Sequence, residues 1–202
     1  MALFQAHYNL LLFDFRAHGE SEGRMTSFGW REQGDLEGAL AFLGKQPEIP
    51  PRPYGVFGIS MGGAVALMVS AKDERIGAVV VDSVHANLEE SLGHHIRLLY
   101  RLPEIPFLFF ISSAYRTWFG VWPRHMSPLH TIRHTSPRPV MLIAGDNDPR
   151  IPVKQTRRLF EAASKPKELW LVQGAGHLEA LSREPETYRS RLTVFFDSNL
   201  RS

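Results

Sequence analysis

Short, continuous apolar runs recur along the chain and alternate with segments of helical spacing. The apolar runs are residues 9–15, 54–59, 76–81, 140–144 and 168–172. Continuous hydrophobicity, without alternation, is typical of strands buried on both faces of a parallel sheet. Helical spacing is found at residues 36–43, 64–71 and 153–163, and in a C-terminal stripe of Tyr188, Leu192, Phe195 and Phe196. This order predicts an α/β fold, a mostly parallel sheet flanked by helices.

One region departs from the alternation. Residues 83–137 contain a helical stretch at 88–102, which is followed by Pro103, Pro106 and a cluster of aromatic side chains. The aromatic residues are Phe107, Phe109, Phe110, Tyr115, Trp118, Phe119 and Trp122. We expect a helical cap insertion over the carboxyl edge of the sheet, within a single domain spanning residues 1–202. The aromatic side chains either line an acyl or aryl pocket or form a small core of the insertion itself.

Composition narrows the function classes. The 202 residues are 44% hydrophobic and 22% charged, which suits one globular domain. The formal net charge is only +2 and no dense basic block occurs, so we expect no nucleic-acid partner. The absence of cysteine excludes disulfides, thiolate catalysis and cysteine-based zinc sites. His130 and His134 are four residues apart but lack an evident third ligand, so we expect neither a metal nor another cofactor.

The residue pattern leads us to expect neither a signal peptide nor a membrane span. The first residues do not have the basic region, long apolar run and cleavage site of a signal peptide. The most apolar internal stretch, residues 107–111, is too short to cross a bilayer. We therefore expect no membrane span and a cytoplasmic location.

The chemistry-bearing motif is Gly58-Ile59-Ser60-Met61-Gly62, a G-x-S-x-G pattern. It follows a predicted strand and begins a predicted helix, which is the setting in which this pattern presents a nucleophilic serine. The turn must be sharp, so the flanking residues must lack bulk. We predict Ser60 as the nucleophile and the Met61 N–H as an oxyanion donor.

Two further polar loops follow predicted strands. Asp148 comes after the run at 140–144, and His177 comes after the run at 168–172. Parallel sheets place their sites at the carboxyl ends of strands, so Ser60, Asp148 and His177 are expected to meet there as a catalytic triad. Asp146 and Asp82 are alternative acids, and loop or cap hydrogen bonding is the other interpretation of both.

These segments resemble the α/β-hydrolase superfamily, and within it the Bem46-like and serine aminopeptidase-like bacterial hydrolases. The matching segments are residues 11–23, 55–67, 140–152 and 167–181. The resemblance implies Ser60 as nucleophile, Met61 as one oxyanion donor, Asp148 as the acid and His177 as the base, and its Asp-Pro pattern favours Asp148. Ala17 stands where the family usually has glycine, in a loop that Arg16, His18 and Ser21 are expected to shape.

The family pattern begins earlier than this sequence does. Relatives carry a strand that ends in a His-Gly loop, which supplies a second oxyanion donor. The strand lies between those predicted at 9–15 and 54–59, and residues 1–8 resemble the tail of the helix that follows it. We expect either a truncated chain or direct pairing of the two flanking strands. An exposed edge would also favour a homodimer.

The residues together predict a serine hydrolase that cleaves a carboxylic ester, with amides and thioesters as alternatives, in a small-molecule substrate. The alternative is a truncated or non-catalytic relative that acts as a binding or regulatory domain. Substrate identity is beyond the sequence, because this superfamily carries many reactions on one scaffold.

Overall fold

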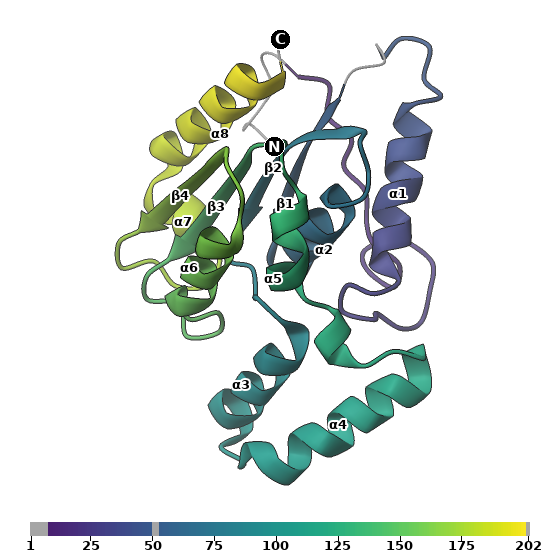
Figure 1. Ribbon diagram of the computed structural model, residues 1–202, viewed down its shortest axis with the longest axis vertical. Coiled ribbons are helices and arrows are strands. Elements are labelled where there is room, and N and C mark those ends of the chain that lie inside the picture. The colour runs from purple at the N-terminus through teal and green to yellow at the C-terminus, as the bar shows by residue number, and fades with distance from the viewer. Residues whose placement is uncertain (1–7, 50–52, 201–202) are drawn as a thin grey trace.

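The computed structural model describes residues 8–49 and 53–200, and within them four strands form one parallel sheet (Figure 1). The order across the sheet is β1-β2-β3-β4. The strands are β1 (Tyr54–Ile59), β2 (Ile76–Asp82), β3 (Val140–Gly145) and β4 (Lys167–Val172). Since sequence neighbours are also neighbours in space, the sheet grows in one direction from β1. Four of the five predicted strands are therefore confirmed.

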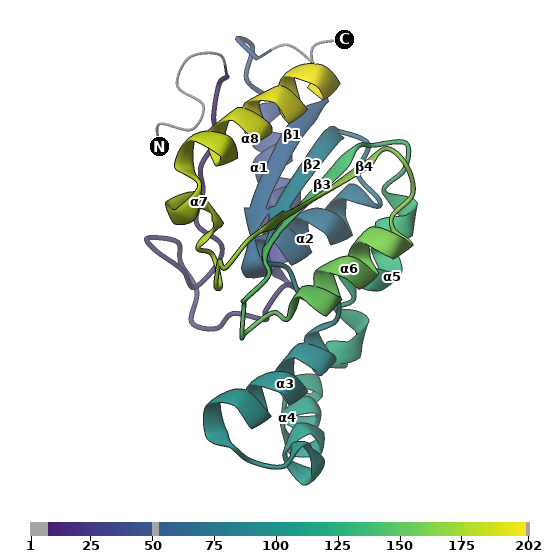
Figure 2. The same cartoon turned by 90° about the vertical axis from the view of Figure 1, so that its left-hand side faces the viewer.

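Helices cover both faces of the sheet (Figures 1 and 2). On one face lie α1 (Glu32–Leu43), α2 (Ser60–Ser70) and α6 (Val153–Ala162), where they enclose an aliphatic core with the sheet. The other face is covered by α8 (Pro185–Leu200), with the short α7 (Ala180–Arg183) beside β3. The predicted C-terminal stripe is confirmed, because all four of its side chains are buried against the sheet.

The strand predicted at residues 9–15 is wrong. This segment is not assigned to any strand, and its side chains from Leu10 to Phe13 are exposed. Direct pairing of this segment with β1 is also excluded, because among the described residues β1 pairs only with β2. A continuous apolar run becomes a buried strand only where neighbours satisfy its backbone groups.

Space separates the segment at 9–15 from β1. A cavity of about 440 Å³ is lined by the segment on one side and by Tyr54, Gly55 and Phe57 on the other. A second cavity of about 360 Å³ continues between the same partners toward Ser60. The free edge of β1 is therefore separated from the segment and not covered by it. The helical tail expected at the start of the chain lies mainly outside the described residues.

The region predicted as an insertion is helical. It comprises α3 (Leu88–Tyr100), α4 (Glu104–Phe119), η1 (Pro123–His125), α5 (Pro128–Thr131) and η2 (Ile132–His134). Helices α3 and α4 form a hairpin that projects from the body beyond the end of β2 (Figures 1 and 2). Tyr115 is buried, but Phe109, Phe110 and Trp118 are exposed. Most of the aromatic side chains therefore fit neither the expected acyl or aryl pocket nor the expected small core of the insertion.

Candidate active site

Ser60 occupies a strained turn between β1 and α2. Its φ of +48° lies in the left-handed region, which non-glycine residues rarely adopt. The turn is sharp enough that a Cβ on Gly58 would lie 2.5 Å from the Gly62 carbonyl oxygen, and one on Gly63 would lie 2.3 Å from Val84. The requirement for small flanking residues is confirmed. Met61 follows in the first turn of α2, where backbone N–H groups have no helical acceptor.

Asp148 and His177 form a hydrogen-bonded pair. The loops that carry them follow the adjacent strands β3 and β4, and His177 Nδ1 lies 2.7 Å from Asp148 Oδ2. The other carboxylate oxygen of Asp148 accepts the N–H groups of Arg150 at 2.8 Å and Ile151 at 2.9 Å. The side chain of Asp148 is 1% exposed, and that of His177 is 13% exposed. The contact with Asp148 leaves the imidazole Nε2 available for another partner.

The two loops are held together by backbone contacts. A Cβ on Gly145 would lie 2.1 Å from the Ala175 carbonyl oxygen, so only glycine fits at the end of β3. The Asn147 N–H donates to that same carbonyl at 3.0 Å. Asp146 accepts the Gly174 N–H at 2.6 Å. Asp146 therefore ties the two loops together and does not contact the imidazole, which agrees with the interpretation of Asp146 as a loop residue.

Asp82 lies at the end of β2 and faces a different set of partners. Its carboxylate accepts the Tyr188 hydroxyl at 2.8 Å and the Ser83 hydroxyl at 2.9 Å. Burial raises the pKa of Asp82, and these two hydrogen bonds only partly offset that effect. The Leu178 N–H in turn donates to Ser83 Oγ at 3.4 Å. Asp82 thus supports the His177 loop indirectly, and the direct partner of the imidazole is Asp148.

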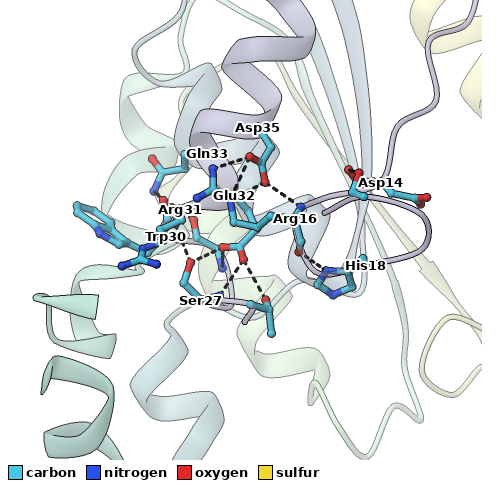
Figure 3. Close-up of polar contacts among 12 residues, drawn as sticks. Asp14, Arg16, His18, Ser27, Trp30, Arg31, Glu32, Gln33 and Asp35 are labelled. Carbon is cyan, nitrogen blue, oxygen red and sulfur yellow. Dashed lines mark hydrogen bonds and ion pairs between the residues drawn. The ribbon is translucent and has the colours of Figure 1, made fainter. Parts of the chain in front are cut away.

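The loop that follows residues 9–15 is stabilised by Arg16 (Figure 3). The Arg16 guanidinium pairs with Asp35 of α1 at 2.6 Å, and the Arg16 N–H donates to the same carboxylate at 3.1 Å. His18 Nδ1 lies 2.9 Å from the Arg16 carbonyl oxygen, and Ser21 Oγ donates to the Asp14 carbonyl at 2.7 Å. The expected shaping role of these residues is confirmed. Ala17 adopts a left-handed φ of +58°, which explains why glycine is usual there.

Glu32 is a buried carboxylate that the sequence reasoning missed. It has no exposed surface, and it accepts the N–H groups of Ser27 at 2.8 Å and Gly29 at 2.9 Å and the Thr26 hydroxyl at 3.0 Å (Figure 3). Burial by itself raises the pKa of Glu32, but hydrogen bonds from Ser27 and Gly29 outweigh it, and the pKa lies below its ordinary value. The available signal was an acidic residue in the first turn of a helix that follows a Thr-Ser pair.

This network connects the loop to both helix α4 and the nucleophile turn. Tyr115 of α4 donates its hydroxyl proton to the Ser27 carbonyl at 2.6 Å. Thr26 Oγ1 lies 3.7 Å from the sulfur of Met61. On the opposite side of the site, His94 of α3 donates from Nε2 to the Pro149 carbonyl at 2.7 Å. Helices α3 and α4 are therefore attached close to the Asp148 loop and to the Ser60 turn, respectively.

The site is incomplete in two respects. Among the hydrogen bonds within residues 8–49 and 53–200, none joins Ser60 to His177, although the His177–Asp148 bond is formed. The cavity between residues 11–15 and the nucleophile turn also borders Ser60 and Met61. The nucleophile turn is therefore open on the side that faces residues 11–15.

Metal binding finds no support in the geometry of the described chain. The rings of His130 and His134 lie edge to face, with centroids 6.3 Å apart and planes at 60°. In the part of the chain that the structure describes, no group of three or more His, Asp or Glu side chains could hold a metal ion. Within the same residues, none of the helices is both long and apolar enough to cross a bilayer.

The model of the alpha/beta hydrolase family matches residues 1–190, and the chain belongs to this family. The uncharacterized protein YqkD of Bacillus subtilis is 32% identical over 193 residues, which cover 95% of this chain and 63% of the relative. The uncharacterized protein YfhR of Escherichia coli K12 is 28% identical over 97% of this chain and 63% of its own length. The chain thus spans less than two thirds of these relatives.

A solved structure shows the same fold. The esterase Pf2001 of Pyrococcus furiosus superposes with a TM-score of 0.79 at 30% sequence identity, over 98% of this chain and 73% of that one. The α/β-hydrolase fold predicted from the sequence is therefore confirmed, in a shortened form. The family membership inferred from the motifs is confirmed as well.

Proposed function

We propose that this protein is a serine hydrolase that cleaves a carboxylic ester through an acyl-enzyme on Ser60. The observation that carries the proposal is the 2.7 Å hydrogen bond between His177 and the buried Asp148, at the same edge of the sheet as Ser60. A buried carboxylate on Nδ1 fixes the imidazole tautomer and stabilises the imidazolium that forms during catalysis. The similarity to an esterase of known structure supports the substrate class.

The proposed reaction uses only groups of this chain and water. Ser60 Oγ attacks the ester carbonyl carbon while His177 Nε2 takes the hydroxyl proton. The Met61 N–H stabilises the tetrahedral oxyanion, and collapse expels the alcohol, which receives the proton from His177. Water, deprotonated by His177, then attacks the acyl-enzyme; the bond to Ser60 Oγ breaks, the carboxylic acid leaves, and His177 returns the proton to Ser60 Oγ. Amides and thioesters would follow the same steps with a different leaving group.

A second candidate function, a non-catalytic binding or regulatory domain, is favoured by one observation. The nucleophile turn is open to a cavity of about 360 Å³, where the family resemblance leads us to expect a second oxyanion donor. Loss of one such donor typically lowers kcat by about 10²–10³-fold. The two candidates therefore predict either slow but serine-dependent turnover or none.

The test is hydrolysis of p-nitrophenyl acetate and butyrate by the purified chain and its variants. Ser60→Ala should abolish turnover, and Asp148→Asn should lower kcat by about 10⁴-fold. Asp82→Asn is the matched control and should retain most of the activity, because Asp82 does not contact the imidazole. An equal loss of activity in Asp82→Asn and Asp148→Asn would contradict the assignment of Asp148 as the acid of the triad.

Labelling with a fluorophosphonate probe separates the two candidate functions. The probe reacts with an activated serine without requiring a particular leaving group. Labelling of the folded chain that Ser60→Ala removes would support the hydrolase even when the esters are poor substrates. A folded chain that is neither labelled nor active would favour the binding domain.

A further inference from the structure

The projecting hairpin exposes an unusual amount of apolar surface. We call α3, α4 and the loop between them, residues 88–119, the arm. Six of its large apolar side chains are more than half exposed, and they gather toward the end of α3 and along α4. They are Leu99, Tyr100, Ile105, Phe109, Phe110 and Trp118. Figures 1 and 2 show the arm standing away from the sheet, so the body does not cover these side chains.

These exposed side chains are not the internal core of the arm. That core is a separate cluster in which Leu88, Tyr115 and Met126 pack with Met68 of α2. Only Ser112 and Tyr115 of α4 are buried. The exposed rings therefore remain available after the arm has packed against itself and the body. Large apolar side chains that stay exposed in this number are typical of an interaction site.

The distribution of rings around α4 indicates what kind of partner fits. Successive residues of a helix point about 100° apart, so Phe109 and Phe110 face different directions. Their ring centroids lie 5.8 Å apart with the planes at 70° to each other. Ile111 and Phe107, also exposed, point to a third side of the same turn. A flat, rigid protein surface would contact one of these directions, whereas a fluid boundary into which the helix sinks can contact more than one of them.

The charge of this region also indicates the kind of partner that fits. Over the whole arm three arginines balance three glutamates, but Glu89 and Glu90 lie in the first turn of α3. The part that carries the exposed rings, residues 97–119, contains three arginines and one glutamate, a formal charge of +2. The glutamate, Glu104, is paired with Arg97. Arg101 lies at the end of α3, and Arg116 and Arg124 lie over the Trp122 ring at 4.8 Å and 5.2 Å. Such a surface is complementary to anionic phosphates beside an apolar phase.

We propose that the arm is a docking element for the surface of a bilayer that contains anionic phospholipid. Phe109, Phe110 and Ile105 enter the acyl boundary, Tyr100 and Trp118 lie at the level of the headgroups, and the arginines contact lipid phosphates. Because α3 contacts Pro149 and α4 contacts Ser27, docking brings the Ser60 edge of the sheet close to the membrane. The arm lies on the bilayer and does not span it.

The experiment is co-sedimentation of the whole chain with vesicles. One set is phosphatidylcholine alone, and the other contains about one quarter phosphatidylglycerol. We expect the protein to partition into the anionic vesicles, to bind less at high salt and to bind less to the neutral vesicles. The Phe109→Ser/Phe110→Ser double variant should lower the partition coefficient at least about tenfold. Arg101→Gln should lower it about fivefold on anionic vesicles only.

Leu12→Ser is the matched control, because Leu12 is also an exposed apolar residue but lies outside the arm. It should leave partitioning unchanged. Tryptophan emission should shift to the blue when vesicles are added, and Trp118→Phe should remove this shift. This measurement leaves Phe109 and Phe110 unchanged. A protein that remains in the supernatant with both vesicle sets overturns the proposal. So does sedimentation velocity that shows a dimer which the double variant dissociates, since the arm would then bind a second copy.

Discussion

Strand β3 and the segment at residues 9–15 have the same kind of sequence but opposite environments. Both are continuous apolar runs followed by a polar loop. All six residues of β3 are buried, whereas Leu12 is 65% exposed. The strand has β2 on one side and β4 on the other, and the segment pairs with no strand. A continuous apolar run can therefore form a buried strand, but it does so only where neighbouring strands pair with it.

The difference extends to the chemistry of the loops. The loop after β3 donates backbone N–H groups to the carbonyls of Val172 and Ala175, at the end of β4 and in the loop after it. These two loops carry the Asp148–His177 pair. The loop after residues 9–15 depends instead on side chains, chiefly Arg16 with Asp35 and Glu32 with its three donor residues. In the loop after residues 9–15, which follows no strand, ionised side chains take the place of strand pairing in fixing the backbone.

The largest expected effect comes from truncating the same residue type in the two regions. Leu142→Ala in β3 should lower the free energy of unfolding by about 2–5 kcal/mol, because it leaves a cavity in the core. Leu12→Ala should change it by less than about 0.5 kcal/mol. Urea unfolding followed by circular dichroism measures both. Equal costs would mean that the segment at 9–15 is packed in solution as a strand is.

A smaller effect is expected from the buried carboxylate of the loop. Glu32→Gln should cost about 1–3 kcal/mol, because an amide cannot accept hydrogen bonds from all three donor residues. The pKa of Glu32 is lowered in the folded state, so the wild-type advantage should be full above about pH 4.3 and be lost as pH falls through the folded pKa. Glu37→Gln, on the same helix in a surface ion pair, is the control and should cost less than about 0.5 kcal/mol.

Asp82 at the end of β2 should show the opposite pH dependence. Its pKa is raised by burial, so ionisation of Asp82 is less favourable in the folded than in the unfolded state. The free energy of unfolding of the wild type should therefore fall as pH rises from the unfolded pKa, about 3.9, to the folded pKa. Relative to wild type, Asp82→Asn should therefore gain stability as pH rises to the folded pKa, and then level off. Unfolding free energies measured from acid to neutral pH test this. A gain in the relative stability of Asp82→Asn as pH falls would contradict the raised pKa of Asp82.

The smallest expected effect is a stabilisation. Ala17 has a φ of +58°, a conformation in which a Cβ is strained. Ala17→Gly should raise the free energy of unfolding by about 0.5–1 kcal/mol, because glycine adopts this conformation without the penalty. Thermal unfolding should show a small upward shift, and Ala39→Gly, in the interior of α1, should shift it downward. No gain at position 17 would indicate that the loop has another conformation in solution.

Much of the site could be predicted because its signals are local. The G-x-S-x-G pattern requires small residues at a sharp turn, and the structure shows Gly58 and Gly63 in contacts that exclude a Cβ. Asp148 and His177 follow two apolar runs that pair as adjacent strands, so their meeting follows from the topology. Glu32 was missed because its burial depends on Ser27 and Gly29 folding back onto α1, which residue spacing does not encode.

The sequence by itself determined the α/β alternation, four of the strands, the buried stripe of α8 and the residues that could form a triad, since each depends on periodicity or on motif chemistry along the chain. The tertiary structure decided which acid contacts the imidazole, that the apolar run at 9–15 forms no strand, and that the rings of α4 face outward. Those outcomes depend on which neighbours are present in space. A chain supplies hydrogen-bonding groups and apolar surface, but only packing selects the partners that satisfy them.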